Sequence, residues 1–135
     1  MNRKRLFLVA LMLTIAAGAM AQQMYDRSGS VIGRYDNGRI YDRSGSYVGK
    51  VDASRFYNGS GSYVGYERDG RFYDHSGSYL GYRKDERFYD RSGSYLGYIK
   101  NGNVYNRSGS LIGRFRNVPH SIIALVYFYG LFPLR

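Results

Sequence analysis

A nine-residue segment returns every 16 residues along most of this chain, and no other feature limits its fold as strongly. The segment reads YDRSGSVIG from residue 25, YDRSGSYVG from 41, YNGSGSYVG from 57, YDHSGSYLG from 73, YDRSGSYLG from 89 and YNRSGSLIG from 105. No insertion interrupts this register between residues 25 and 116. The common helical repeats need about 33 residues or more per unit. A unit of 16 residues therefore excludes them.

Each unit carries two turn signals, which divide it into two short strands. The first is the D/N-x-S-G-S segment, in which Asp or Asn begins a turn and Gly takes a positive φ. The second is DNG at 36–38, RDG at 68–70 and KNG at 100–102. Asn-Gly and Asp-Gly favour two-residue hairpin turns. Two units have DAS at 52–54 and KDE at 84–86 instead, and we expect these two turns to be strained or differently shaped.

The segments between the turns are rich in Tyr, Phe, Val and Ile, which favour strands. Both connections are too short for a crossover, so neighbouring strands must be antiparallel. The repeat therefore predicts an up-and-down meander of roughly twelve strands. Open twisted sheets rarely exceed about ten strands. We expect an all-β sheet that closes around a pseudo-rotational axis, since closure also removes the sheet edges.

Two positions of the repeat hold only apolar side chains, and we predict that both face the core. The first comprises Ile32, Val48, Val64, Leu80, Leu96 and Ile112, and the second comprises Met24, Ile40, Phe56, Phe72, Phe88 and Val104. Side chains alternate between the two faces of a strand. The Gly after each aliphatic residue is therefore predicted on the opposite face, beside the tyrosines, unless a β-bulge shifts the alternation.

The pattern G-x-I/F-Y-D-x-S-G-x-x-I/V-G-x-I resembles that of the β-flower proteins, which are small secreted bacterial proteins described as four-fold or five-fold β-flowers. The resemblance covers residues 24–116. It implies a rotationally repeated all-β domain in which each petal is a short hairpin, and it brings no established activity or binding residues with it. Because the chain has six Ser-Gly-Ser segments, we expect a five-fold or six-fold β-flower.

The first 21 residues have the pattern of a secretory signal peptide. A basic stretch at 3–5 precedes an apolar run at 6–19, and Ala19 and Ala21 occupy the two positions that signal peptidase reads. We predict cleavage after Ala21, export to the periplasm or the outside of a bacterial cell, and no integral membrane segment in the mature chain. The alternative is an uncleaved anchor, but the run is shorter than the roughly 20 residues that span a bilayer.

The chain therefore divides into a signal peptide at 1–21, a hairpin-repeat domain at 22–117 and an apolar tail at 118–135. The tail contains the uncharged run SIIALVYFYGLF at 121–132, which is also too short to span a membrane. Two interpretations of the tail stay open. It forms a last strand or a short helix that plugs one end of the flower, or it did not evolve together with the repeats.

Regular repetition argues against an enzyme, because a catalytic site needs a few unlike residues that converge at one place. The two histidines lie in a variable turn position (His75) and in the tail (His120), and the chain has no cysteine. Asn58 and Asn106 replace the aspartate of the repeat in two copies, which is typical of a turn and not of a calcium loop. We predict a non-enzymatic protein without cofactor or metal.

Tyrosine and positive charge are the strongest functional signals. The chain has 16 tyrosines, and its 20 basic residues against 10 acidic ones give a net charge of +10. One position of the repeat alternates between aromatic and basic side chains, and we predict that it lies near the solvent. Its occupants, the predicted site residues, are Arg34, Lys50, Tyr66, Tyr82, Tyr98 and Arg114.

These side chains suit a glycan or an envelope protein as partner, because Tyr offers a broad contact area together with a hydroxyl group. Aromatic and basic residues would also suit nucleic acid, but the predicted export argues against that partner. The alternative is a purely structural protein whose tyrosines only pack a thin sheet. Such a protein would stack on copies of itself and form homo-oligomers.

Overall fold

The computed structural model describes residues 22–134, so the predicted signal peptide at 1–21 lies outside the described residues. Twelve strands form one closed barrel in which β1 pairs with β12 and every other strand pairs with its neighbours in sequence. The strands are β1 (Gln23–Asp26), β2 (Val31–Asp36), β3 (Arg39–Asp42), β4 (Tyr47–Asp52), β5 (Arg55–Asn58), β6 (Tyr63–Arg68), β7 (Arg71–Asp74), β8 (Tyr79–Lys84), β9 (Arg87–Asp90), β10 (Tyr95–Lys100), β11 (Asn103–Asn106) and β12 (Leu111–Arg116).

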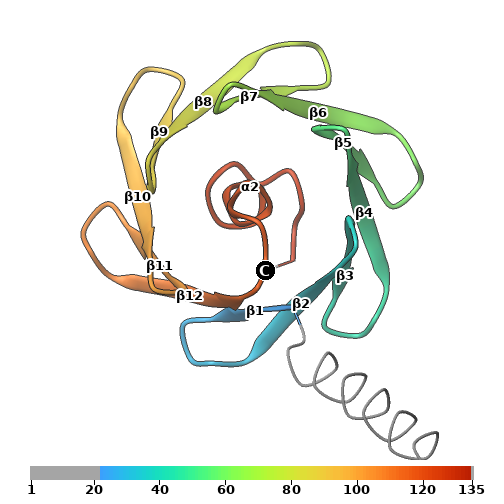
Figure 1. Cartoon of the computed structure of the whole chain (residues 1–135), viewed down its shortest axis with the longest axis horizontal. Coiled ribbons are helices and arrows are strands. Elements are labelled where there is room, and N and C mark those ends of the chain that lie inside the picture. Colours follow the sequence, from blue (N-terminus) through green and yellow to red (C-terminus); the bar gives the residue numbers. More distant parts are fainter. Residues whose placement is uncertain (1–21, 135) are drawn as a thin grey trace, which may run out of the picture.

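All strand pairs are antiparallel, and the fold class predicted from the repeat is confirmed. Figure 1 looks down the barrel axis and shows the hairpins spreading outward like petals. Each of the six copies of the repeat contributes one complete pair of strands, and the circle closes where Tyr25 pairs with Arg114. The structure thus has six hairpins rather than five.

Two kinds of turn alternate along the wall, and the first is held by the aspartate or asparagine of the repeat. The Oδ1 atom of Asp42 accepts hydrogen bonds from the backbone N–H groups of Ser44 and Ser46, both at 2.9 Å. Gly45 follows in the left-handed region, with a φ of 87°. Asn58 and Asn106 make the same bonds in their own turns. The interpretation of this position as a turn residue is confirmed.

The second kind of turn is the two-residue hairpin turn that the Asn-Gly signal predicts. Asn37 and Gly38 both have positive φ, at 49° and 91°, as a type I′ turn requires. Ala53 and Ser54 hold the same conformation, at 50° and 65°, although a Cβ atom makes it unfavourable. In the KDE turn only Asp85 has a positive φ. One substituted turn is thus strained and the other differently shaped, as expected.

The apolar rows lie on the inner face of the wall. Met24, Ile40, Phe56, Phe72, Phe88 and Val104 are all fully buried, which confirms their predicted place in the core. In the aliphatic row Ile32 is buried, and the other members are half-buried and pack against the same core.

The glycine after each aliphatic residue lies on the inner face too, so its predicted placement beside the tyrosines is wrong. Phe56 pairs with Gly65 and Tyr57 pairs with Tyr63, which leaves Val64 as an extra residue. This β-bulge shifts the alternation by one position. It returns Gly65 to the core side, and each outer tyrosine lies opposite another side chain instead of a glycine.

The apolar tail fills the centre of the barrel. It forms α2 (His120–Ile123) and a π-helical turn, η1 (Ala124–Phe128), which Figure 1 shows as a coil on the axis inside the ring of strands. We call residues 120–134 the plug. Its side chains are mostly buried, and the helical interpretation of the tail describes it better than a last strand. No helix described between residues 22 and 134 is long and apolar enough to cross a bilayer.

The plug contacts the wall in a regular order, one side chain for each hairpin. A Cβ atom added to an inner glycine would meet one plug side chain in every case. The pairs are Gly113 with Tyr127, Gly97 with Phe128, Gly81 with Tyr129, Gly65 with Leu131, Gly49 with Phe132 and Gly33 with Leu134. The plug therefore winds once around the axis, and the repeat keeps a glycine wherever the plug approaches the wall.

Candidate binding surface

The predicted site residues occupy one register position on the outer wall. Each of them lies directly opposite the tyrosine of a Tyr-Asp or Tyr-Asn pair. The pairs are Arg34 with Tyr41, Lys50 with Tyr57, Tyr66 with Tyr73, Tyr82 with Tyr89, Tyr98 with Tyr105 and Arg114 with Tyr25. The structure thus arranges them as a ring around the barrel and does not bring them together in one pocket.

The aromatic and basic occupants of this position make related contacts. The rings of Tyr66 and Tyr73 are stacked with centroids 4.7 Å apart and planes at 14°. Tyr82 and Tyr98 stack on their partners at 4.8 and 4.7 Å. Where the position is basic, a cation lies over the tyrosine ring, with the Arg34 guanidinium 4.2 Å from the centroid of Tyr41. Either contact stabilises the sheet by about 0.5–1.5 kcal/mol.

Further tyrosines extend these pairs into several groups of contacting rings, which together we call the tyrosine belt. The belt comprises Tyr41, Tyr47, Tyr57, Tyr63, Tyr66, Tyr73, Tyr79, Tyr82, Tyr89, Tyr95, Tyr98 and Tyr105, with neighbouring ring centroids 4.7–6.0 Å apart in the cross-strand pairs.

The planes of the stacked rings in the belt are nearly parallel, at 14–17° to each other. Their spacing matches the roughly 4.8 Å between neighbouring strands, so one face of each ring covers the next ring. Stacking therefore withdraws one face of each of these rings from the solvent. Partial desolvation raises the pKa of Tyr63, Tyr79 and Tyr95 above the usual value of about 10. Tyrosine hydroxyl groups are protonated at neutral pH even at that usual value, so those of the belt can donate hydrogen bonds.

Each site residue also has a partner on its other side, and together they form cross-strand rows of three residues. In every row the last residue of a long strand lies opposite the first residue of a short strand, which lies opposite a site residue. The six rows are Asp36–Arg39–Lys50, Asp52–Arg55–Tyr66, Arg68–Arg71–Tyr82, Lys84–Arg87–Tyr98, Lys100–Asn103–Arg114 and Arg116–Gln23–Arg34.

The charge of these rows divides the wall into two arcs. The two rows that begin with Asp36 and Asp52 each contain one carboxylate, which stands beside two cations in the first row and one cation in the second, and we call them the balanced rows. The other four follow one another around the barrel and contain two cations and no carboxylate each; these are the cationic rows. Among the described residues, the ion pairs are Arg34 with Asp36 at 4.0 Å and His120 with Glu86 at 2.9 Å. The cations of the middle rows therefore lack a carboxylate partner.

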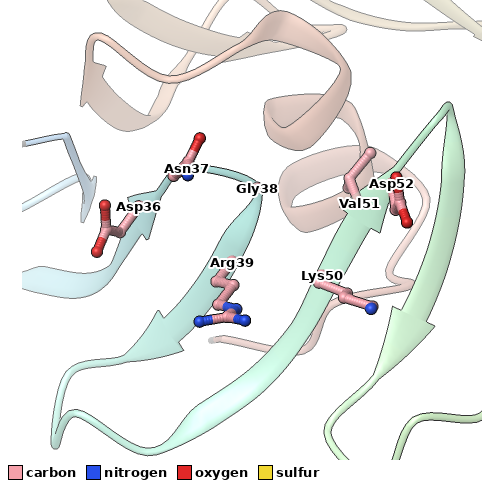
Figure 2. Close-up of a pocket in the computed structure, with 7 residues that line it drawn as sticks. All are labelled: Asp36, Asn37, Gly38, Arg39, Lys50, Val51 and Asp52. Atoms are coloured by element: carbon pink, nitrogen blue, oxygen red, sulfur yellow. The ribbon is translucent and has the colours of Figure 1, made fainter.

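Shallow hollows lie beside the hairpin turns at equivalent places of the repeat. Figure 2 shows one, lined by Asp36, Asn37, Gly38, Arg39, Lys50, Val51 and Asp52, in which Arg39 and Lys50 lie on neighbouring strands. Equivalent hollows adjoin Arg87 with Tyr98, and Asn103 with Arg114. The same short contact surface thus recurs around the wall, which suits a repetitive partner better than an enclosed small molecule.

The polar groups near the axis serve to hold the plug. The Tyr129 hydroxyl donates hydrogen bonds to the carbonyl oxygens of Tyr89 and Tyr82, at 2.8 and 3.1 Å, and burial raises its pKa strongly. The Ser121 hydroxyl donates to the Glu67 carboxylate. Within residues 22–134, no group of three or more His, Cys, Asp or Glu side chains is placed to hold a metal ion.

Sequence reasoning predicted the register position of the candidate site residues but missed their row partners. Arg39, Arg55, Arg71 and Arg87 recur every 16 residues at the start of the short strands, and this regularity was visible in the sequence. Their pairing with the site residues was not visible in the sequence, because the β-bulge sets the register on one side of each short strand.

Comparison with known proteins gives one match. A family model described as "5-fold beta-flower protein" matches residues 21–131. No curated protein and no solved structure matches the chain. The matched region spans all six hairpins and most of the plug, although the family description names five-fold symmetry.

Proposed function

The chain belongs to the 5-fold β-flower family, and we propose that it is a secreted, non-enzymatic binding module whose outer wall holds a glycan at the cell envelope. The observation that carries this proposal is the tyrosine belt, which presents hydroxyl groups beside arginines at regular intervals. Sugars are recognised by such groups, since every ring carries several hydroxyls that need hydrogen-bond partners.

The repetition of the surface favours a glycan over a protein partner. A protein interface usually depends on a few central residues in a well-packed pocket. Here the hollows are shallow and recur at equivalent positions, which suits a polymer of similar units. Several weak contacts to one polymer add up to a strong interaction, because each contact raises the local concentration of the next unit.

The predicted signal peptide supports a role outside the cytoplasm. The family match begins at residue 21, where the predicted cleavage site lies. The absence of cysteine means that the mature chain would not rely on disulfides after export. Its stability would come instead from the closed barrel and the plug.

The test is a glycan array combined with binding to cell-wall fractions. The purified protein should bind at least one glycan, and the variant Tyr66→Ala/Tyr82→Ala/Tyr98→Ala should bind it about tenfold or more weakly. Circular dichroism and a melting curve would establish that the triple variant is folded. The proposal fails if the natural protein binds no glycan or cell-wall fraction more strongly than the triple variant does.

A structural role is the second candidate, and one observation favours it. The belt tyrosines stack on one another, so part of their contact area already stabilises the sheet. In that case the flower would assemble with copies of itself. Light scattering would show growth in mass with concentration, and a strict monomer at high concentration would contradict this candidate.

A further inference from the structure

We propose that the ligand is an acidic polysaccharide that lies across the four cationic rows, on the arc from β6 through β12 to β2. This inference rests on the proposed function and specifies its ligand. It starts from the difference in charge between equivalent rows of one repeat.

Two of the cationic rows place like charges directly opposite each other. Arg68 pairs with Arg71, and Lys84 pairs with Arg87. Directly opposed like charges destabilise a sheet. Asp69 and Asp85 lie in the connecting turns, but neither forms an ion pair in the described part of the chain. The balanced rows have an aspartate at the position of Arg68 and Lys84, so the repeat can accommodate the neutralising residue there. Anionic groups of a ligand would supply the missing negative charge.

The spacing of the rows suits a linear polymer with regularly placed acid groups. Rows follow one another every two strands, which is roughly 10 Å around the wall. An extended polysaccharide chain advances by a distance of this order over two sugar units, so a polymer with an acid group on every sugar or on every second sugar can meet each row. Arg71 and Arg87 can each bind a carboxylate or sulfate with two parallel hydrogen bonds. Tyr82 and Tyr98, in the same rows, lie beside them as hydroxyl donors.

The geometry of the wall disfavours other polyanions. Single-stranded nucleic acid needs free aromatic faces on which bases stack, whereas the rings of Tyr82 and Tyr98 are already stacked on Tyr89 and Tyr105. A bilayer surface would reach only one side of a barrel around which the four rows curve. A flexible acidic polysaccharide can follow the curvature and contact several rows together.

The test compares matched arginine pairs from the two arcs. Polygalacturonate, dextran sulfate and neutral dextran are titrated into the protein at several salt concentrations. We expect polygalacturonate or dextran sulfate to bind with an affinity that falls as salt rises, and neutral dextran not to bind. Arg71→Gln/Arg87→Gln should weaken binding about tenfold. Arg39→Gln/Arg55→Gln removes the same charge from the balanced rows and should weaken it less than about twofold.

Each other outcome has a separate meaning. Equal losses in the two arginine pairs would show general charge attraction and would overturn the inference. Binding of a neutral glycan, insensitive to salt and to both arginine pairs, would overturn it and leave the proposed function standing. Tighter binding of single-stranded DNA than of either acidic polysaccharide would overturn it as well. Melting curves of both double variants exclude loss of fold as the cause.

Discussion

The inner and outer faces of the same barrel wall follow different rules. On the inner face every copy of the repeat has a glycine and a large apolar residue, and each glycine contacts one residue of the plug. On the outer face the site position changes between tyrosine, lysine and arginine, and the first residue of the row changes between acid and base. The recurrence of glycine and apolar residues on the inner face therefore reflects packing against the plug. The variation of side chains on the outer face reflects what the wall contacts.

The difference has a physical cause. Protein interiors are packed as densely as organic crystals, so adding or removing one methylene group changes the stability of the fold. The plug is a single segment that must fit six copies of the wall, which keeps a glycine at each point where a plug side chain approaches the wall. Outer side chains can reorient in water, and exchanging tyrosine for arginine there keeps a contact with the opposite tyrosine ring.

The largest expected effect tests this contrast on two neighbouring residues of β10. A Cβ atom at Gly97 would lie 2.7 Å from the Phe128 ring and would also collide with the Tyr105 carbonyl. Gly97→Val should therefore lower the free energy of unfolding by about 3 kcal/mol or more. Tyr98→Ala, on the outer face, removes one stacked ring and should cost about 1 kcal/mol. Urea unfolding measures both, and equal losses would contradict the contrast.

A smaller effect is expected from a single hydroxyl of the plug. Tyr129→Phe leaves the ring against Gly81 but removes the donor to the carbonyl oxygens of Tyr89 and Tyr82. We expect a loss of about 1 kcal/mol in the free energy of unfolding. The matched change Tyr89→Phe removes a hydroxyl from the outer face and should change stability by less than about 0.5 kcal/mol. If both variants unfold at the same urea concentration, the hydroxyl bonds of Tyr129 do not hold the plug.

Acid should weaken the turns that join each short strand to the long strand after it. The serine hydroxyl two residues on, together with backbone N–H groups, holds the pKa of Asp26, Asp42, Asp74 and Asp90 below its usual value. A carboxylate with a lowered pKa in the folded state stabilises the fold above its unfolded pKa of about 3.9, and this contribution is lost as the pH falls through the lower folded value. The melting temperature should therefore decrease below about pH 4.

The repeat itself supplies the control for this pH dependence. Asn58 and Asn106 make the same turn bonds without a titrating group. Replacing the four aspartates of these turns with asparagine should flatten the acid side of the curve of melting temperature against pH. An unchanged curve would assign the acid sensitivity to carboxylates outside these turns.

The repeat predicted most of the wall, because local rules set it. Turn residues such as Asn37 and Gly38 determine the hairpins, and the apolar row that includes Phe56 and Phe72 follows from side-chain alternation. The inner position of Gly65 depended on the bulge at Val64, which arises from pairing between strands and has no signal within one strand. The order in which plug residues such as Tyr129 meet the glycines depends on contacts between distant parts of the chain, and periodicity does not report them.

The smallest expected effect is a change in stability that has opposite signs for two arginine variants, one from each arc of the outer face. Arg87 lies opposite Lys84, whereas Arg55 lies opposite Asp52. Removing one charge should therefore stabilise the fold in Arg87→Gln and destabilise it in Arg55→Gln, each by about 0.2–0.5 kcal/mol at low salt. Both differences should shrink in 1 M salt, where screening leaves exposed charges little interaction. If Arg87→Gln raises the melting temperature and also weakens polysaccharide binding, the cations of this row are retained at a cost in stability, which a purely structural role does not explain. A fall in melting temperature for both variants would show instead that the two arcs do not differ.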